Sequence, residues 1–567
     1  MAEDVRTPWL DNYPPGVAEQ VEIPRHNLAR LLDDAARQFP DAPALHFEGR
    51  TFTYAELATR TWTFAGALAG LGVGKGTKVG TILPNCPQAV MTLLGALRLG
   101  AIVVQNNPLY TERELVHQLA DAGVEVLVCL DLMYGKVKRV RAAHPLREVI
   151  VTSVIDELPS LKRLLAPYTR RGRAAMAKLA KDEPVRRWRQ VLASSPGPAA
   201  ETPVDPDTDL AVLQYTGGTT GLSKGVMLTH TNLNANAVQV REWMPDLEPG
   251  REVVLAALPF FHSYGLTTCL TLGLKLGAAI VLLPRFELGR VLDAIDQHHP
   301  TLFPGVPTMY VAINNAAEGH DLSSIKACVS GAAPLPIEVA EEFERLSGGR
   351  LVEGYGLSEA SPVTHANPIY GKRKVGTVGM PLPDTLARVT DPADPSRTMP
   401  IGEAGELAVK GPQVMRGYWN RPEETAQVLQ DGWLLTGDMA TMDEEGYFAI
   451  VDRKKDMIIA GGYNIYPREV EEVLYEHPKV MEAAVAGVPD AYLGEVVKAF
   501  VVLRPGQQAT TEEIRAFAKE RLARYKVPRL VEFRDELPKT MIGKVLRRKL
   551  VEEEQAKAAA GSGREDV

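Results

Sequence analysis

Residues 215–225, with the sequence YTGGTTGLSKG, have the composition of a loop that binds phosphate groups. The glycines let backbone N–H groups approach a ligand closely, the hydroxyls add hydrogen-bond donors, and Lys224 adds positive charge. The loop is not of the GxxxxGK[ST] type, because two residues separate Gly221 from Lys224 and a glycine follows the lysine. The residues therefore predict a polyphosphate site, with a plain flexible turn as the alternative.

Apolar runs flank this loop and recur along the chain, where they alternate with helical patterns. Buried strands are expected at 78–83, 124–129, 253–257 and 279–283, and helical spacing lies between them, for example at 88–99. Such alternation is typical of parallel or mixed sheets that are covered by helices. The elements that position the loop are therefore expected to form an α/β fold.

Length and composition limit the class of protein further. A chain of 567 residues leaves room for about three or four folding units. With 45% apolar and 24% charged residues, the chain is neither mainly disordered nor fibrous. Its net charge of −8 argues against nucleic acid as a partner of the whole chain.

Several features favour a cytoplasmic protein. The four cysteines lie far apart without a CxxC pair, which predicts buried thiols rather than disulfides or a zinc site. They are Cys86, Cys129, Cys269 and Cys328. Residues 1–15 lack the apolar core of a secretory signal. The near-apolar stretch 266–283 contains Lys275, so a buried helix followed by a strand is expected rather than a membrane span.

Two charged segments interrupt the α/β pattern. Residues 156–190 are rich in arginine and lysine, and their leucines fit an apolar helical stripe. This basic helix is a candidate for peripheral contact with the anionic inner face of the cell membrane, and a solvated surface insertion is the alternative. Five consecutive charged residues at 452–456 indicate a linker between domains, and a disordered tail is expected at 557–567.

Five short segments combine glycines with charged or hydroxyl side chains. They are 215–230 (YTGGTTGLSKGVMLTH), 354–359 (GYGLSE), 432–438 (GWLLTGD), 452–466 (DRKKDMIIAGGYNIY) and 538–544 (PKTMIGK). In their order and spacing they resemble the motifs of the adenylate-forming superfamily of acyl- and aryl-CoA ligases, luciferases and adenylation domains. Residues 107–119 (NPLYTERELVHQL) and the basic insertion look most like bacterial long-chain fatty acid–CoA ligases.

The resemblance implies a reaction in two steps. A carboxylate attacks the α-phosphate of ATP to give an acyl-adenylate and pyrophosphate, and the thiol of coenzyme A then displaces AMP. Lys544 would be the catalytic residue, because its charge would bridge the carboxylate and the α-phosphate. The implied fold is a large N-terminal domain at 1–452 (two β-α-β subdomains plus a small β-barrel part), a hinge at 453–456, and a small mobile α+β C-terminal lid domain at 457–567.

The resemblance also implies a role for individual residues. The ATP- or AMP-binding residues would be Thr216, Gly217, Gly218, Thr219, Thr220, Gly221, Lys224, Gly331, Ala332, Glu353, Gly354, Tyr355, Gly356, Ser358, Asp438, Arg453 and Lys455. Glu359 and Thr216 would hold a Mg2+ ion. The acyl pocket would include His262, Tyr264 and Gly265, and the tunnel for coenzyme A would include Gly461 and Gly462.

Two positions depart from the family pattern. Ile459 and Ala460 stand where many members carry Lys-Ser, and Leu266 stands where some long-chain members carry a gating tryptophan. The implied function is ATP-dependent ligation of a long- or medium-chain fatty acid to coenzyme A, by a chain that is a candidate homodimer. The alternatives are an aryl- or hydroxycinnamate-type CoA ligase, an acyl-AMP ligase that loads a carrier protein, and a nucleotide- or lipid-binding protein without activity.

Overall fold

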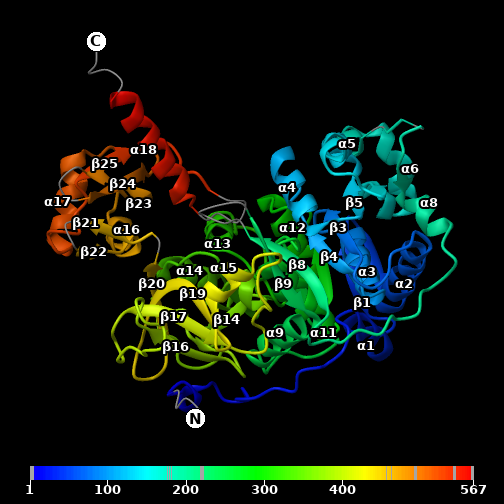
Figure 1. Cartoon of the computed structure of the whole chain (residues 1–567), viewed down its shortest axis with the longest axis horizontal. Helices are drawn as coiled ribbons and strands as arrows, with labels where there is room; N and C mark the ends of the chain where they lie inside the picture. The colour runs from blue at the N-terminus through cyan, green and yellow to red at the C-terminus, as the bar shows by residue number, and fades with distance from the viewer. Residues whose placement is uncertain are drawn as a thin grey trace.

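The chain folds into a large N-terminal part and a smaller C-terminal lobe (Figure 1). The computed structural model describes residues 6–174, 176–177, 179–180, 182–216, 223–454, 456–460, 463–490, 494–539 and 545–562. Both parts mix helices with strands, as the α/β pattern of the sequence predicts.

The first sheet of the N-terminal part has seven strands in the order β7-β6-β5-β3-β4-β8-β9. Its strands are β3 (Lys78–Ile82), β4 (Ile102–Gln105), β5 (Val126–Leu130), β6 (Glu148–Thr152), β7 (Arg186–Arg187), β8 (Leu210–Thr216) and β9 (Lys224–Thr229). Neighbours pair in parallel except β8 and β9, which are antiparallel.

Helices cover both faces of this sheet, which is why its strands are apolar without alternation. In β5, Val126 and Val128 pack with α2 (Tyr54–Gly70) and α3 (Pro87–Arg98) in one apolar cluster. Its alternate residues pack into a second cluster that contains side chains of the helices α4 (Glu112–Ala122) and α5 (Asp131–Ala143). The two faces of the sheet therefore lie in two separate cores.

Two four-stranded sheets follow, and Leu302 connects them through parallel bridges to Val254 and Ala327. The first has the order β10-β11-β1-β2, with β1 (Pro43–Phe47), β2 (Arg50–Thr53), β10 (Val253–Ala256) and β11 (Ala279–Leu282). The second contains β12 (Ala327–Ser330), β13 (Arg350–Gly356), β14 (Val363–Ala366) and β15 (Met380–Pro381). The helices around them include α12 (Leu288–His298), α13 (Pro307–Asn314) and α14 (Ile337–Ser347).

Helix α9 (His230–Glu242) is buried although many of its residues are polar. Its amide side chains donate to backbone carbonyls of distant segments: Asn232 to Val414, Asn236 to Val363, and Gln239 to Pro383. These bonds satisfy the amide N–H groups and at the same time hold two loops and the start of β14 in place. The segment near Val414 continues directly into the candidate site.

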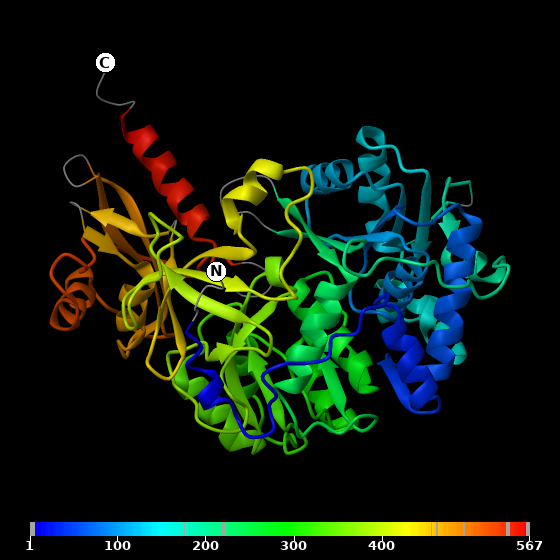
Figure 2. The ribbon, with the colours of Figure 1, turned by 60° about the horizontal axis from the view of Figure 1, so that its bottom comes forward.

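The part expected as a small β-barrel is a five-stranded antiparallel sheet. It consists of β16 (Leu386–Thr390), β17 (Gly405–Lys410), β18 (Leu429–Gln430), β19 (Trp433–Met442) and β20 (Phe448–Arg453). Figure 2 shows it in yellow between the larger sheets and the C-terminal lobe, with the N-terminal segment in blue running past it. Tyr13 on that segment donates a hydrogen bond to the Pro381 carbonyl.

The C-terminal lobe has its own sheet and its own apolar core. Its strands are β21 (Ile458–Ala460), β22 (Tyr463–Ile465), β23 (Val480–Asp490), β24 (Gly494–Leu503) and β25 (Leu530–Phe533). Its helices are α16 (Pro467–Tyr475), α17 (Thr511–Arg521) and α18 (Arg547–Ser562). The small α+β lobe that the family resemblance implies is therefore present.

Most local expectations are confirmed. The predicted strands correspond to β3, β5, β10 and β11, and residues 266–283 form a buried π-helical turn, η4 (Leu266–Thr271), helix α11 (Leu272–Leu276) and strand β11. The four cysteines are buried and unbonded. In the part of the chain that the structure describes, no helix is long and apolar enough to span a bilayer.

Two expectations are wrong. The basic segment is not one amphipathic helix but a series of short ones, α6 (Ser160–Leu165), η3 (Ala166–Tyr168) and α7 (Arg170–Ala174). Pro167 interrupts the α-helix after α6, and Thr169, whose backbone is extended, separates η3 from α7. The predicted disordered tail is helical as far as Ser562, in continuation of α18.

Candidate active site

The β8–β9 hairpin carries the predicted phosphate loop. Thr216 ends β8 and pairs in register with Lys224, which begins β9, so these two residues flank the base of the loop. A Cβ atom on Gly225 would lie 3.1 Å from the ring of Tyr215, which shows how closely the base is packed. The loop residues Gly217, Gly218, Thr219, Thr220 and Gly221 lie outside the described residues.

Tyr418 connects two of the predicted site residues. Its hydroxyl donates to Glu359 Oε1 over 2.8 Å, and Lys224 Nζ lies 4.9 Å from the centre of its ring. Lys224 also forms an ion pair with Glu424 on helix α15 (Pro422–Val428). The structure thus brings the predicted phosphate lysine and the predicted metal ligand to either side of one tyrosine.

A second pair joins strands from different sheets. The Tyr355 hydroxyl on β13 donates to Asp438 Oδ2 on β19 over 2.6 Å. Asp438 pairs in register with Arg453, the last residue of β20, whose side chain lies outside the described part. The residues expected to bind the base and the ribose therefore lie together, and the tyrosine hydroxyl orients the carboxylate.

The small residues near this pair allow close backbone packing. A Cβ atom on Gly354 would lie 2.7 Å from a Val329 methyl group, and one on Gly356 would lie 2.1 Å from the Pro362 carbonyl. Gly331 follows β12, and a Cβ atom there would lie 3.0 Å from the ring of Tyr264. Ala332 has a φ of 68°, a left-handed conformation that alanine rarely adopts. The chain therefore bends directly after β12, and the conformations of Gly331 and Ala332 set this bend.

The segment expected at the acyl pocket touches the nucleotide residues. Ser263 Oγ lies 3.1 Å from Ser358 Oγ, and His262 Nδ1 accepts from the Tyr264 N–H over 3.3 Å. Tyr264 is buried, and its hydroxyl donates a hydrogen bond to the Val329 carbonyl over 2.7 Å. The hydroxyl therefore has a partner within the fold. A Cβ atom on Gly265 would lie 2.4 Å from the Pro259 carbonyl.

Two cavities adjoin these residues. A narrow cavity of about 10 Å3 lies beside Phe260 and Phe261 and is lined mainly by apolar side chains. A larger one of about 170 Å3 lies between Glu359 and Gly437, the neighbour of Asp438. The second cavity therefore spans the distance between the predicted metal ligand and the predicted ribose ligand.

The linker to the C-terminal lobe is held by an ion-pair network. Arg547 forms ion pairs with Asp452 (3.5 Å) and Asp456 (3.3 Å), and with Glu471 (2.6 Å). Lys539 and Val545 form an isolated antiparallel bridge, which closes the base of the segment that contains Lys544. Lys544, Lys455, Gly461 and Gly462 themselves lie outside the described residues.

Sequence reasoning missed the residues that connect these groups. Tyr418, Arg421 and Glu424 all lie in the segment 417–425, GYWNRPEET, whose glycine, aromatic and charged residues were a usable signal. Asp121 carried no such signal. It accepts from the Tyr215 hydroxyl (2.7 Å) and pairs with Arg421 (3.2 Å), and thereby ties the phosphate hairpin to that segment.

Glu353 lies on β13 beside the C-terminal lobe. Burial raises its pKa to about 7, against the opposing effects of Arg468 on α16 and of the Leu335 N–H. That N–H donates to Glu353 Oε2 over 3.3 Å. The carboxyl is thus near the midpoint of its titration at neutral pH.

This shift makes the stability of the chain depend on pH. The pKa of Glu353 is about 7 when folded and 4.5 as the unperturbed value, so the folded chain binds the extra proton between these values. The free energy of unfolding should therefore fall as pH rises through that window, by about 3 kcal/mol. Glu353→Gln should lose this decline in a series of thermal or urea unfolding curves.

The exposed Glu338→Gln on α14 is the matched control and should keep the parental pH profile. If Glu353→Gln declined over the same window as the parent, another group would be responsible.

Comparisons with known proteins agree with this geometry. The family model described as AMP-binding enzyme matches residues 32–419, and the one described as AMP-binding enzyme C-terminal domain matches residues 469–544. The chain is similar to a protein of Bacillus subtilis named long-chain-fatty-acid–CoA ligase, with 52% identity over 96% of this chain and 98% of that protein.

Two further relatives widen the range of substrates among similar proteins. A protein of Amycolatopsis named feruloyl-CoA synthase is 40% identical over 90% of this chain and 96% of its own length. A crystal structure of the anthranilate CoA ligase AuaEII in complex with anthranoyl-AMP has a TM-score of 0.84 and 27% identity, and covers 95% of this chain and 99% of that one. The chain therefore belongs to the AMP-binding enzyme family.

Proposed function

We propose that this chain ligates a long- or medium-chain fatty acid to coenzyme A through an acyl-adenylate, with release of AMP and pyrophosphate. ATP and coenzyme A are the co-substrates. The observation that carries the proposal is the 52% identity, over nearly the whole of both chains, to the fatty acid ligase of Bacillus subtilis. The contacts of Tyr418 with Lys224 and with Glu359 support it, as does Asp438. These groups suit a nucleoside triphosphate.

Positive charge does most of the chemistry in the first step. The carboxylate and the α-phosphate are both anionic, and the transition state concentrates their charge. Lys544 bridges the two groups and lowers that barrier, and loss of one such contact typically costs about 3–4 kcal/mol, or a factor of about 10²–10³. Lys224 and the N–H groups of residues 217–221 hold the remaining phosphates.

The nucleoside lies against β13 and β19. Tyr355 stacks on the adenine, and Glu353, Gly354, Gly356, Gly331 and Ala332 surround the base. Asp438 accepts from the ribose hydroxyls, and Arg453 assists it. The hydrogen bond from the Tyr355 hydroxyl fixes one oxygen of Asp438, which supports this role because the carboxylate is already oriented. Ser358 contacts a phosphate.

Glu359 and Thr216 are the residues that would hold Mg2+. Both offer oxygen atoms, as Mg2+ prefers, and few protein ligands are expected because phosphate oxygens and water supply the others. Within the described residues, no cluster of three or more His, Cys, Asp or Glu side chains is arranged to hold a metal ion. The ion would neutralise phosphate charge.

The second step requires a different position of the C-terminal lobe. We place the N-terminal domain at 1–452, the hinge at 453–456 and the lid domain at 457–567, with Lys455 in the hinge. Strands β20 and β21 lie on either side of this hinge in different sheets, which supports a joint there. Rotation withdraws Lys544 and places Gly461 and Gly462 along the path of the coenzyme A thiol.

The acyl chain enters beside Phe260 and Phe261. The lining of the narrow cavity there is mainly apolar and includes no charged side chain among the described residues, as an aliphatic tail requires. Its volume of about 10 Å3 has room for about one water molecule, so these side chains must move apart before a tail can enter. His262 closes the pocket behind the carboxylate, next to Tyr264 and Gly265. Leu266 is fully buried, so a side chain at this position packs and does not gate.

The proposal predicts the products for a panel of acids. Fatty acids from octanoate to stearate should release pyrophosphate. They should release AMP and form the acyl thioester only when coenzyme A is present. Benzoate and hydroxycinnamates should turn over at least about tenfold more slowly, because each unmatched contact in a pocket costs about 1–3 kcal/mol. Assay of pyrophosphate measures the first step, and chromatographic assay of AMP and of the acyl thioester measures the second.

Faster turnover of hydroxycinnamates than of any fatty acid would favour an aryl-CoA ligase. Acyl-AMP formation without transfer to coenzyme A would favour loading of a carrier protein. No pyrophosphate with any acid would leave only a binding protein.

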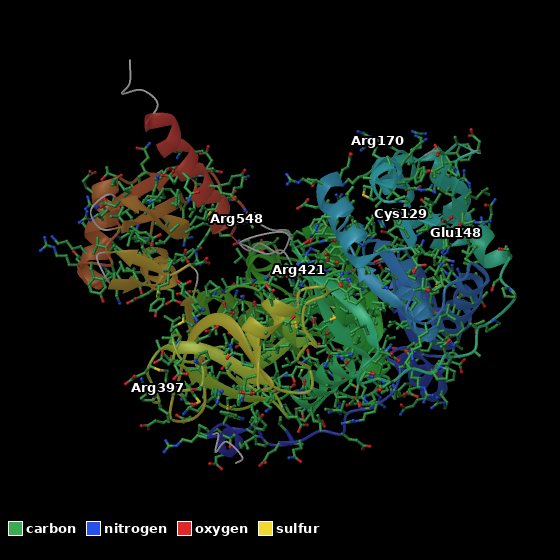
Figure 3. All side chains as sticks on the ribbon, in the orientation of Figure 1. Cys129, Glu148, Arg170, Arg397, Arg421 and Arg548 are labelled. Atoms are coloured by element: carbon green, nitrogen blue, oxygen red, sulfur yellow. The ribbon has the colours of Figure 1, made fainter. Side chains whose placement is uncertain are left out.

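We further propose that the chain contacts the inner face of the cell membrane through α6 and η3. Leu161, Leu164 and Tyr168 are 68%, 69% and 78% exposed and recur at helical spacing. Arg163 lies between these residues in the sequence and Arg170 follows them, and Figure 3 shows Arg170 at the outer edge of the N-terminal part. An exposed apolar face beside basic side chains suits an anionic lipid surface, from which a fatty acid can be collected.

The base of this surface is rigid. Glu157 is 1% exposed and accepts hydrogen bonds from Arg60 (2.5 Å), from Arg50 (3.0 Å) and from the Trp188 indole (3.0 Å). A buried carboxylate that is paired on several sides holds its helix firmly. The apolar residues after it are thus presented on a fixed support.

Vesicle binding tests this surface. The triple variant Leu161→Ser/Leu164→Ser/Tyr168→Ser should bind vesicles of phosphatidylglycerol at least about tenfold more weakly, because each apolar side chain contributes about 1.5–3 kcal/mol when fully buried. Added salt should weaken parental binding, and phosphatidylcholine vesicles should bind poorly. Val375→Ser, which changes a residue that is also 68% exposed, is the control. Unchanged sedimentation of the triple variant would mean that the segment is merely solvated.

A further inference from the structure

The ammonium of Lys224 already has an anionic partner from the protein. Glu424, on the first turn of α15, forms an ion pair with Lys224 Nζ. We propose that Glu424 is an exchange partner for the triphosphate: it neutralises Lys224 when no nucleotide is bound, and it yields the lysine to a phosphate oxygen when ATP enters. This inference rests on the proposed function, because it takes Lys224 as a ligand of the phosphates.

Each side of the exchange has another partner. Arg421 Nε lies 3.6 Å from Glu424 Oε1, so the carboxylate keeps a cation nearby after Lys224 has left it. Lys224 in turn lies over the ring of Tyr418, which attracts a cation in both states. Neither charge is therefore left without a partner during the exchange, and the barrier to it is low.

The exchange is also easy because the pair is only partly buried. The side chains of Lys224 and Glu424 are 33% and 36% exposed. A partly exposed ion pair is weak, since water screens its charges, whereas contacts of lysine with a polyphosphate are charge-assisted and multiple. Glu424 can thus compete with ATP without excluding it.

The position of Glu424 is fixed by backbone contacts. The Trp419 N–H donates to the Gly225 carbonyl (2.7 Å), beside Lys224, and the Tyr418 N–H donates to Thr425 Oγ1 (2.9 Å) on α15. The segment before α15 is therefore attached to β9, and the first turn of α15 is attached to that segment. These contacts hold Glu424 in place opposite Lys224.

Arg421 is anchored in the same way. It pairs with Asp121 on α4, and Figure 3 shows it in the middle of the molecule, near the C-terminal lobe in that view. Because Asp121 also accepts from the Tyr215 hydroxyl, the cation that would retain Glu424 is tied to the phosphate hairpin. The alternative partner stays in place while the lysine changes partners.

The inference predicts that removal of the carboxylate strengthens nucleotide binding. Glu424→Gln should lower both the Kd for Mg·ATP and the KM for ATP in ATP–pyrophosphate exchange by about two- to fivefold, the range of one partly exposed ion pair. The KM for the fatty acid should not change. Titration calorimetry with Mg·ATP measures the Kd directly and needs no turnover.

Glu423→Gln is the matched control, because it removes the same charge from the neighbouring, exposed position of the same helix. It should leave the affinity for Mg·ATP at the parental value. Glu424→Ala provides a second removal of the carboxylate in case the glutamine retains a hydrogen bond to Lys224.

Two results distinguish failure of the proposed exchange from failure of the assignment of Lys224 to the phosphates. Unchanged or weaker Mg·ATP binding in both Glu424 variants would overturn the exchange and make Glu424 a positioning residue for Lys224. If Lys224→Met bound Mg·ATP as tightly as the parent, the assignment of Lys224 to the phosphates would fail, whatever the Glu424 variants do.

Discussion

Two anions must be held against each other in the proposed first step, and this constraint accounts for the groups that the fold brings together. A carboxylate approaches a triphosphate only where fixed positive charge and oriented hydrogen-bond donors replace water. Lys224 at the start of β9, with its partners Glu424 and Tyr418, supplies one such centre. Lys544, brought by the C-terminal lobe, supplies the other in our account.

The centre depends on contacts between segments that are far apart in sequence. Tyr355 reaches Asp438 from a different sheet, and Tyr418 reaches Glu359. Each contact is a hydroxyl that donates to a carboxylate, so it fixes the orientation of an acceptor as well as its position. The buried amides of α9 hold the loop that leads to Tyr418, and thereby connect the core to the site.

The sequence was sufficient for elements whose signal is local. Apolar runs such as 78–83 predicted strands, and the apolar runs on either side of the glycine-rich loop correspond to β8 and β9. Partners distant in the chain left no such signal: Asp121 is paired with Arg421, and Glu353 is affected by Arg468, only because of the tertiary fold. The uniform helix expected at 156–190 was wrong because Pro167 and the extended backbone of Thr169 divide the segment into short helices.

The most direct test separates the two half-reactions in Lys544→Ala. Pyrophosphate exchange reports formation of the acyl-adenylate, and reaction of presynthesised acyl-adenylate with coenzyme A reports the second step. The account predicts that exchange falls by at least about 10²-fold while thioester formation largely persists, and that the exposed Lys549→Ala changes neither. Exchange at the parental rate in Lys544→Ala would contradict the account.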